Sequence, residues 1–379
     1  MYQHFLINSN LCSHIAHNTK GSFANVNIRK YKCNMKIALL TKKKKFEVTE
    51  EKINKKLKND EVLVKISGTG ICGSDLHFFR NGALGSMTPQ FPLSLGHETS
   101  GIIVDKNKSN FKNYSNVIID PLDISACKKI EKELCGCGLK HNLCSHQTYL
   151  GSHPTKGSFR EFMVLKKSQL TILDKNIDPK TSSMIEPAGI AQYCIDRAMI
   201  DKNLENNILI LGCGAIGMLI SSLLHSVGIK NITILDKNKD RLAHAKKYFN
   251  AKKLIKLNLD KNINPEKNNY NYVFDLITNN QSFDHGIKAI SKSGKYIVVG
   301  IPETEDFIKI NPHKLRIKEI DILNVRRSNV KFSRMQSIII KNSIPIDKLV
   351  THYFKIDDIQ KGFNIASSYS DKIIRGIIY

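Results

Sequence analysis

The segment that most restricts the fold of this chain runs from Ile208 to Gly217 and reads Ile-Leu-Ile-Leu-Gly-Cys-Gly-Ala-Ile-Gly. Its four leading apolar residues predict a buried strand, and helical spacing follows from Ile216 to Val227. Between them, Gly212, Gly214 and Gly217 have the G-x-G-x-x-G spacing of a turn that lets a pyrophosphate approach the backbone. We therefore expect a strand–turn–helix unit that binds a dinucleotide at the helix N-terminus.

The chain continues with strands and helices in alternation, which predicts a parallel, doubly wound sheet. The expected strands are 231–235, 272–274, 296–299 and 320–325, and the expected helices are 239–249 and 282–290. Asp236 ends the first of these strands, 19 residues after Gly217. A carboxylate there bonds the ribose 2′-hydroxyl and repels a 2′-phosphate, so NAD is favoured over NADP. The adjacent Lys237 weakens the exclusion of NADP.

The first half of the chain has a different pattern. From Met35 to about Ser182, short β-rich runs alternate with Gly and Pro turns, and residues 61–67 alternate polar with apolar as a half-buried strand does. This predicts a barrel-like, all-β region whose loops carry chemistry. After residue 325 the chain returns to strand-like runs, such as 372–379, up to Tyr379.

Potential metal ligands occur in two loops of this β-rich half. Cys72 lies in Gly-Ile-Cys-Gly-Ser-Asp-Leu-His, and His97 and Glu98 lie in Gly-His-Glu. A thiolate, an imidazole and a carboxylate form a mixed ligand set that zinc accepts, with a fourth position left for water or substrate. A catalytic metal beside a dinucleotide site indicates hydride transfer to or from an alcohol carbon.

These motifs resemble the zinc-dependent medium-chain dehydrogenase/reductase family from about Met35 to Tyr379, and most of all its polyol branch of sorbitol (L-iditol), xylitol and L-idonate dehydrogenases. The resemblance implies an α/β fold with a GroES-like β-barrel catalytic domain and a Rossmann doubly wound parallel sheet. The expected domains are 35–186 and 326–379 for the catalytic domain and 187–325 for the NAD-binding domain. Residues 1–34 have no place in this pattern; we expect a start codon placed too early, with a targeting peptide as the alternative.

The resemblance also assigns roles around the metal. The polyol enzymes carry glutamate at the positions of both Glu98 and Glu186, one coordinating directly and the other through water or on ligand exchange; the sequence does not rank them. Ser74 is expected to contact the substrate oxygen and begin proton removal. His77 would pass the proton onward, because its pKa lies in the working range. Asp75 would orient the His97 ring.

Substrate and cofactor contacts follow from the same resemblance. Phe78 stands where many polyol enzymes have tyrosine, which keeps a simple secondary alcohol or threonine open as the substrate. Arg327 matches an arginine that bonds polyol hydroxyls, with Arg326 as the alternative. Ile216 belongs to the cofactor-binding turn. Arg241 matches a position beside the adenosine ribose, although a surface helical arginine is the other interpretation.

Four cysteines gather where relatives carry a structural zinc lobe. They are separated by seven, one and six residues, whereas the usual lobe reads C-x2-C-x2-C-x7-C. Four cysteines in one loop favour a tetrahedral thiolate site, in which His141 or His146 could replace one ligand. The alternative is a remodelled lobe with free thiols. The cysteines are Cys127, Cys135, Cys137 and Cys144.

The composition limits the remaining classes. A net charge of +24 invites a nucleic-acid interpretation, but the lysines are spread along the chain and no aromatic or Arg-rich signature accompanies them. No apolar run approaches the ~18–20 residues that span a bilayer. We therefore predict a cytoplasmic, NAD- and zinc-dependent dehydrogenase of a polyol or sugar acid. Its relatives imply a homodimer or homotetramer.

Overall fold

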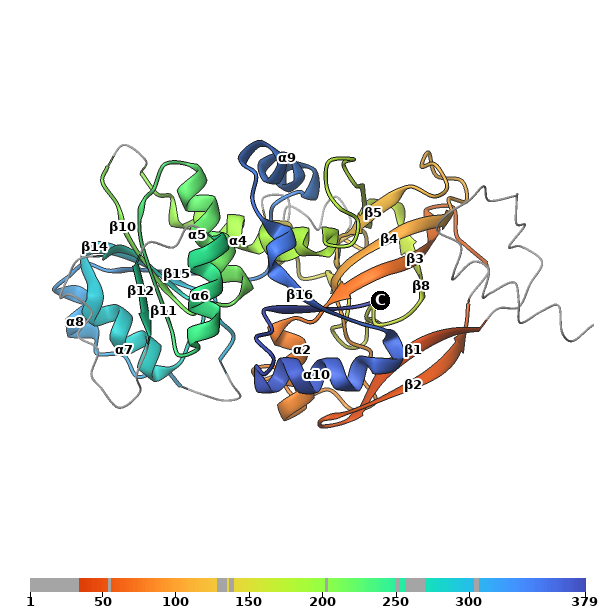
Figure 1. Cartoon of the computed structure of the whole chain (residues 1–379), viewed down its shortest axis with the longest axis horizontal. Helices are drawn as coiled ribbons and strands as arrows, with labels where there is room; N and C mark the ends of the chain where they lie inside the picture. The colour runs from red at the N-terminus through yellow and green to blue at the C-terminus, as the bar shows by residue number, and fades with distance from the viewer. Residues whose placement is uncertain are drawn as a thin grey trace, which may run out of the picture.

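The computed structural model describes residues 34–53, 56–127, 135, 140–201, 204–249, 253–256, 270–302 and 307–379. Two sheets divide these residues into two domains, which lie side by side along the longest axis of the molecule (Figure 1). No described helix is long and apolar enough to cross a membrane.

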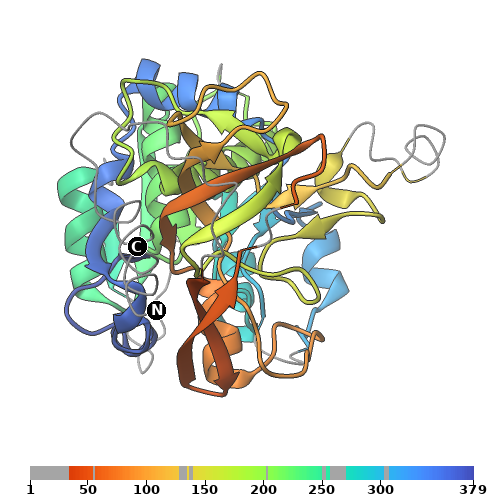
Figure 2. The same cartoon turned by 90° about the vertical axis from the view of Figure 1, so that its right-hand side faces the viewer.

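The first domain is built on a mainly antiparallel, seven-stranded sheet in the order β16-β17-β3-β4-β5-β9, with β8 paired to β3. A hairpin of β1 and β2 lies below this sheet (Figure 1, Figure 2), and β6 pairs with β7 in a short ribbon. The strands are β1 Asn34–Lys42, β2 Lys45–Lys52, β3 Glu61–Gly70, β4 Glu98–Asp105, β5 Asn116–Ile119, β6 Leu122–Asp123, β7 Thr148–Tyr149, β8 Phe162–Lys166, β9 Leu170–Ile172, β16 Val350–Phe354 and β17 Arg375–Ile378.

The second domain confirms the doubly wound sheet. Its six parallel strands have the order β12-β11-β10-β13-β14-β15, in which the chain starts at the centre, winds to one edge and then to the other. Helices α5 and α6 face the first domain, and α7 and α8 lie on the outer side (Figure 1). The elements are β10 Asn207–Leu211, α5 Ala215–Ser226, β11 Asn231–Asp236, α6 Lys239–Tyr248, β12 Lys253–Lys256, β13 Tyr270–Asp275, α7 Asn280–Ala289, β14 Ile290–Val298, α8 Pro312–Arg316 and β15 Asp321–Asn324.

The remaining helices pack around the first domain and between the two. They are α2 Gly73–Asn81, α4 Ile185–Ala198, α9 Phe332–Asn342 and α10 Ile359–Ser368, with short 3₁₀ turns at His141–Leu143, Lys167–Gln169, Ser182–Met184, Ile346–Leu349 and Ile356–Asp358. Helix α4 packs against both α5 and α9. One buried apolar cluster therefore continues from Ile118 and Met184 in the first domain to Ile208 and Leu219 in the second.

The prediction that the tail returns to strand-like runs is wrong for most of its length. Only β16 and β17 are strands after residue 325, and α9 and α10 occupy much of the rest. The three consecutive isoleucines at 338–340 resemble a strand, but only Ile339 is buried. It shares one face of α9 with Phe332 and Met335, so helical spacing fits the burial and alternation does not.

Candidate active site

The pairing of β3 with β4 assembles a cluster of three potential metal ligands. Gly70, at the end of β3, lies opposite Glu98, at the start of β4. Cys72 follows β3 directly and His97 precedes β4, so the two loops meet. The sulfur of Cys72, a ring nitrogen of His97 and a carboxylate oxygen of Glu98 all lie within 4.8 Å of one another.

The environment of this cluster fits a bound cation. Glu98 is 0% exposed, and its Oε2 has no hydrogen-bond partner among the described residues. Burial raises the pKa of the Cys72 thiol far above its usual range, and the nearby Glu98 carboxylate adds to the rise. A thiolate there therefore requires a cation beside it. Gly70 leaves the space, because a Cβ at this position would collide with Oε2 of Glu98.

Two buried charged residues hold the ligands in place. Asp75 accepts hydrogen bonds from the backbone N–H of Cys72 at 3.0 Å and of Gly96 at 3.3 Å, and one of its oxygens lies 3.7 Å from Nδ1 of His97. Arg375, on β17, donates to Oε1 of Glu98 at 2.8 Å and to the Ile71 carbonyl at 2.6 Å. The cluster is therefore fixed from both sides by groups that are themselves buried.

A second polar group adjoins the cluster. Glu186, in the first turn of α4, is 3% exposed and accepts a hydrogen bond from the Tyr149 hydroxyl at 3.1 Å. Its Oε2 has no partner among the described residues, and burial raises the pKa of its carboxyl. The Tyr149 ring lies 5.5 Å from the His97 ring, centroid to centroid. Glu186 is outside the 4.8 Å group and adjoins it through Tyr149.

Arg327 packs over the ring of Tyr149. Its guanidinium carbon is 3.8 Å from the centre of the ring, and Nη1 donates to Oε1 of Gln147 at 2.6 Å. Burial lowers the pKa of Arg327 to about 10, whereas Tyr149 opposes that shift. Arg326 is exposed. Of the two arginines, the structure brings Arg327 to the site.

Helix α2 presents the remaining predicted residues. Ser74 and His77 are half-buried and three residues apart, so they are neighbours on one side of the helix. Phe78 is 3% exposed and packs in an apolar cluster with Phe46 and Phe79. The contact of Phe78 with substrate stays a prediction.

The glycine turn has the geometry that a dinucleotide requires. Gly212 has φ +106°, a conformation that disfavours other residues. A Cβ on Gly217 would collide with the Gly212 carbonyl oxygen, whereas one on Gly214 would meet nothing within 4 Å. Helix α5 therefore begins close to β10 with open space at its N-terminus. Ile216 is half-buried in the first turn of this helix.

Asp236 and Arg241 lie next to the turn. The Asp236 carboxylate, at the end of β11, accepts from the backbone N–H of Cys213 at 2.6 Å and of Asn238 at 2.7 Å. The Arg241 carbonyl accepts from the Cys213 thiol at 3.5 Å. The carboxylate and the first turn of α6 are thus tied to the same glycine loop.

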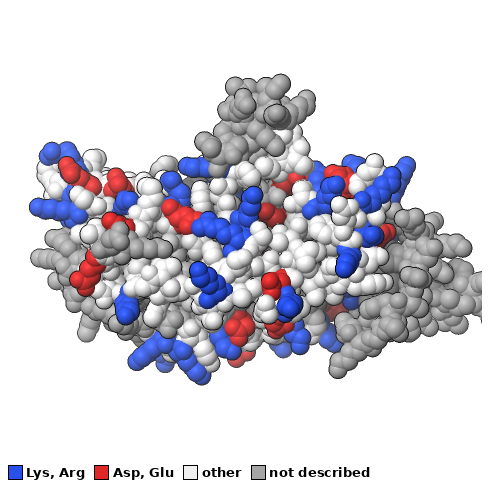
Figure 3. Space-filling view, turned by 90° about the horizontal axis from the view of Figure 1, so that it is seen from above, with Lys and Arg blue, Asp and Glu red and all other residues white. Residues whose placement is uncertain are grey.

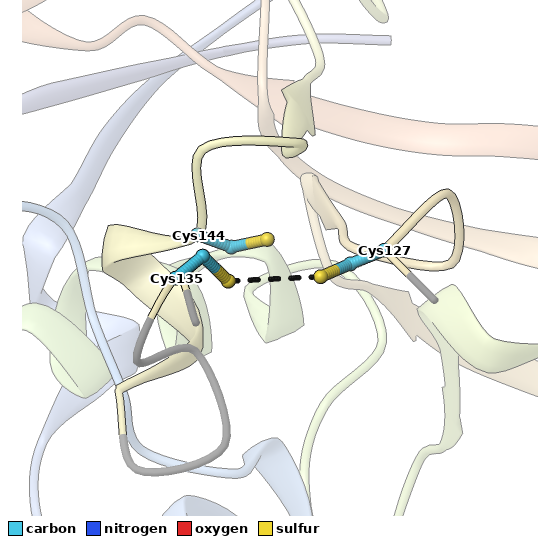
Figure 4. Close-up of side chains that lie close together, drawn as sticks. All are labelled: Cys127, Cys135 and Cys144. Atoms are coloured by element: carbon cyan, nitrogen blue, oxygen red, sulfur yellow. Dashed lines mark hydrogen bonds between the residues drawn. The ribbon is translucent and has the colours of Figure 1, made fainter. Parts of the chain in front are cut away.

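Three of the four lobe cysteines converge (Figure 4). The sulfur atoms of Cys127, Cys135 and Cys144 all lie within 4.8 Å of one another, and those of Cys127 and Cys135 are 3.6 Å apart. Cys137 lies outside the described residues. The alternatives His141 and His146 are exposed and do not join this group.

Comparison with known proteins identifies the family of this chain. A model of the alcohol dehydrogenase GroES-like domain matches residues 58–175, and a model of the zinc-binding dehydrogenase domain matches residues 215–341. The chain belongs to the zinc-dependent medium-chain dehydrogenase/reductase family. This dehydrogenase therefore combines a catalytic domain of GroES-like fold with a Rossmann domain, and the family uses zinc and a nicotinamide dinucleotide.

Individual relatives of the dehydrogenase have low sequence identity to it but match over most of its length. Sorbitol dehydrogenase from Bacillus subtilis (strain 168) is 24% identical over 331 residues, 85% of this chain and 91% of its own length. L-threonine 3-dehydrogenase from Marinomonas sp. (strain MWYL1) is 26% identical over 325 residues, 83% of this chain and 92% of its own length. The crystal structure of L-idonate 5-dehydrogenase from Escherichia coli superimposes with a TM-score of 0.81 at 23% identity, covering 92% of this chain and 98% of that one.

Sequence reasoning missed three residues of the dehydrogenase's site. Arg375 was visible only as a lone cation in the apolar run 373–379, which is a usable signal for a buried, paired charge. Tyr149 and Gln147 follow the cysteine lobe without any motif. Their contacts with Glu186 and Arg327 span 37 and 180 residues of sequence, so no local pattern could have identified them.

Proposed function

We propose that this dehydrogenase oxidises a secondary hydroxyl of a polyol or sugar acid and passes the hydride to NAD. The observation that carries the proposal is the position of Arg327, whose guanidinium covers Tyr149 beside the Cys72–His97–Glu98 cluster. Arginine presents a planar set of donors that suits several hydroxyl or carboxylate oxygens at once. The names of the sorbitol and L-idonate relatives support the same substrate class.

Cys72, His97 and Glu98 would hold a catalytic zinc ion, because their donor atoms converge and Glu98 keeps one unpartnered oxygen. Glu186 is the water-mediated or exchanging ligand, since Tyr149 bonds one of its oxygens and leaves the other free. Zinc would lower the pKa of the substrate hydroxyl, and NAD would accept the hydride.

The chain's own residues supply the proton path and the support. Ser74 accepts the proton of the substrate hydroxyl, and His77, one helical turn later, passes it toward solvent. Asp75 orients His97 from 3.7 Å. Arg375 holds Glu98 through one oxygen and so directs the other toward the cluster.

The assignment of NAD rests on Asp236, which lies at the end of β11 next to the glycine turn. Residues 187–325 form the NAD-binding domain, and residues 35–186 with 326–379 form the catalytic domain. The two sheets support this division, because β10–β15 belong to the parallel one and β3, β4, β16 and β17 to the other.

A structural zinc site at Cys127, Cys135 and Cys144 is also part of the proposal, with Cys137 as the fourth ligand. The convergence of three buried or half-buried sulfur atoms supports it. Its test is the zinc content of the Cys135→Ser variant. The variant is expected to lose one zinc per chain and melt at a lower temperature, and an unchanged zinc content would contradict the site.

The proposal also includes a small-molecule substrate, assembly into a homo-oligomer and a location in the cytoplasm. Strand β15 is an edge of the parallel sheet, and the exposed Phe307 and Ile317 lie near it in sequence, which supports association of two copies. Basic and acidic side chains are interspersed on the face seen in Figure 3, which offers no continuous basic surface to a nucleic acid. None of the six described cysteines forms a disulfide, which fits a reducing compartment.

A second candidate substrate is a simple secondary alcohol or threonine. Phe78 is buried and has no hydroxyl to offer a polyol, and one distant relative is an L-threonine 3-dehydrogenase. NADH formation with sorbitol, xylitol, L-idonate, 2-butanol and threonine distinguishes the two. The proposal expects the highest kcat/KM for a polyol or sugar acid. A preference for 2-butanol or threonine would replace it with the second candidate.

A further inference from the structure

Tyr369 connects the two domains beside the cofactor turn. It follows α10 in the catalytic domain, and its ring lies under the guanidinium carbon of Arg241 on α6, 4.4 Å from the ring centre. A second guanidinium, that of Arg80 on α2, lies 5.9 Å from the same centre. Cations within about 6 Å of an aromatic face are attracted to it, so Tyr369 engages one cation from each domain.

The backbone of Tyr369 is in the left-handed region, with φ +53°. Glycine and asparagine occupy such helix-ending positions with less strain than a bulky residue does. The ring of Tyr369 is half-buried between α2, α10 and α6. A contact that the ring alone supplies therefore offsets an unfavourable backbone conformation.

Arg241 is attached to the dinucleotide turn through its backbone. Its N–H donates to Oδ1 of Asn238 at 3.3 Å, and its carbonyl accepts from the thiol of Cys213, the residue between the first two glycines. Cys213 in turn donates its N–H to Asp236. The turn therefore fixes the backbone of Arg241 and leaves its guanidinium free of the turn. That guanidinium packs on the ring of Tyr369.

Both guanidiniums retain unused donors. The Nε of Arg241 and the Nε of Arg80 are buried and have no hydrogen-bond partner among the described residues. Neither arginine takes part in the ion pairs that the described residues form. Buried donors without a partner and cations without a counter-ion indicate a ligand with acceptor oxygens and negative charge. The ribose and diphosphate of a dinucleotide carry both.

We infer that Tyr369 is a positioning residue for the cofactor: it holds the Arg241 guanidinium toward the adenosine ribose and diphosphate of NAD, so that the catalytic domain contributes to dinucleotide affinity. The inference rests on the proposed use of NAD. It assigns to the residue that follows α10, outside the Rossmann domain, a part in cofactor binding that acts through Arg241.

Titration of the full-length protein with NADH, followed by nicotinamide fluorescence in the absence of any alcohol, tests the inference. Tyr369→Leu removes the ring and is expected to raise the Kd for NADH roughly three- to tenfold. Tyr369→Phe keeps the ring and should restore wild-type affinity. Tyr353→Leu, which removes an exposed ring from β16, is the matched control. Wild-type affinity in Tyr369→Leu would overturn the inference.

A double-mutant cycle separates positioning from a general structural role. In an Arg241→Gln background, Tyr369→Leu should weaken NADH binding by less than twofold, because the ring acts through Arg241. A full additional loss in that background would overturn the inference. Tyr369→Gly removes the ring without backbone strain and should weaken binding as Tyr369→Leu does, which excludes misfolding as the cause. Failure of the wild type to bind NADH would contradict the proposed function itself.

Discussion

The Tyr149 hydroxyl donates a hydrogen bond to Oε1 of Glu186 at 3.1 Å, and the same ring contacts both the imidazole of His97 and the guanidinium of Arg327. One aromatic side chain thereby joins the proposed metal ligands to the proposed substrate contact. Glu186 is buried and keeps its other oxygen unpartnered, so Tyr149 determines which oxygen is free.

Tyr149→Phe removes this hydrogen bond and keeps the ring. Losing one partner of a buried carboxylate costs about 1–2 kcal/mol, so we expect kcat/KM for a polyol to fall roughly five- to thirtyfold. Tyr193→Phe, a matched change on α4, should have no such effect. Steady-state kinetics of the two variants give the comparison. Equal kinetics for both would mean that the Tyr149 hydroxyl has no role.

Arg327→Ala should penalise long substrates selectively. The guanidinium lies beside the cluster of ligands and is expected to bond a hydroxyl or carboxylate away from the reacting carbon. Removing one charge-assisted bond costs about 1.5–3 kcal/mol, or roughly ten- to a hundredfold in kcat/KM for sorbitol or L-idonate. A small secondary alcohol should barely be affected, and Arg326→Ala is the control. Equal losses on both substrate types would indicate a structural role.

Asp236 should enforce the choice of NAD over NADP. Asp236→Ser removes the carboxylate that repels a 2′-phosphate, so the ratio of kcat/KM for NAD to that for NADP should fall about tenfold or more. The serine hydroxyl can still accept one of the two backbone hydrogen bonds that Asp236 receives. If the wild type already uses both cofactors equally, Lys237 or Arg241 decides the preference and this role of Asp236 is wrong.

Asp120 and Asp123 should make the free energy of unfolding change with pH in opposite directions. Burial raises the pKa of Asp120 to about 6, which is above the ~3.9 of an unfolded chain. The contribution of Asp120 to the free energy of unfolding is therefore present below pH 4 and is lost as pH rises through 6. Burial would also raise the pKa of Asp123, but the contacts with Lys166 and Ser125 together outweigh it, and the pKa is lowered. That contribution is present above pH 4 and is lost on acidification.

Asp120→Asn should therefore stabilise the protein at pH 8, by about 1–3 kcal/mol, and the gain should shrink toward pH 4. Asp123→Asn should destabilise it at pH 8, because the ion pair with Lys166 at 2.8 Å is lost. Urea unfolding of both variants at several pH values measures the two effects. A pH-independent difference for Asp120→Asn would show that its carboxyl does not titrate as stated.

The sequence predicted the structure wherever the spacing of residues along the chain determines it. The glycine turn predicted β10 and α5, because a turn that binds a pyrophosphate restricts both the backbone and the packing of the helix on the strand, and the alternation of strands and helices predicted the parallel sheet. Cys72 and His97 were recognisable from the short motifs that contain them, Gly-Ile-Cys-Gly-Ser-Asp-Leu-His and Gly-His-Glu. The register of β3 with β4 then brings them together.

The remainder depends on contacts that no local pattern encodes. Helix α9 was misread because three consecutive isoleucines fit a strand as well as a helix, and its packing decides between them. Arg375 lies 277 residues after Glu98, and Tyr369 meets Arg241 across two domains. Such pairs follow from the completed fold.

Zinc content measured together with polyol-dependent NADH formation tests the central claim most directly, in the wild type and in His97→Ala. The account predicts that the wild type contains zinc and reduces NAD with a polyol. His97→Ala should lose one zinc per chain and on the order of a thousandfold in kcat, while its melting temperature stays close to that of the wild type. Near-normal turnover in His97→Ala, or full activity of a wild type without zinc, would contradict the account.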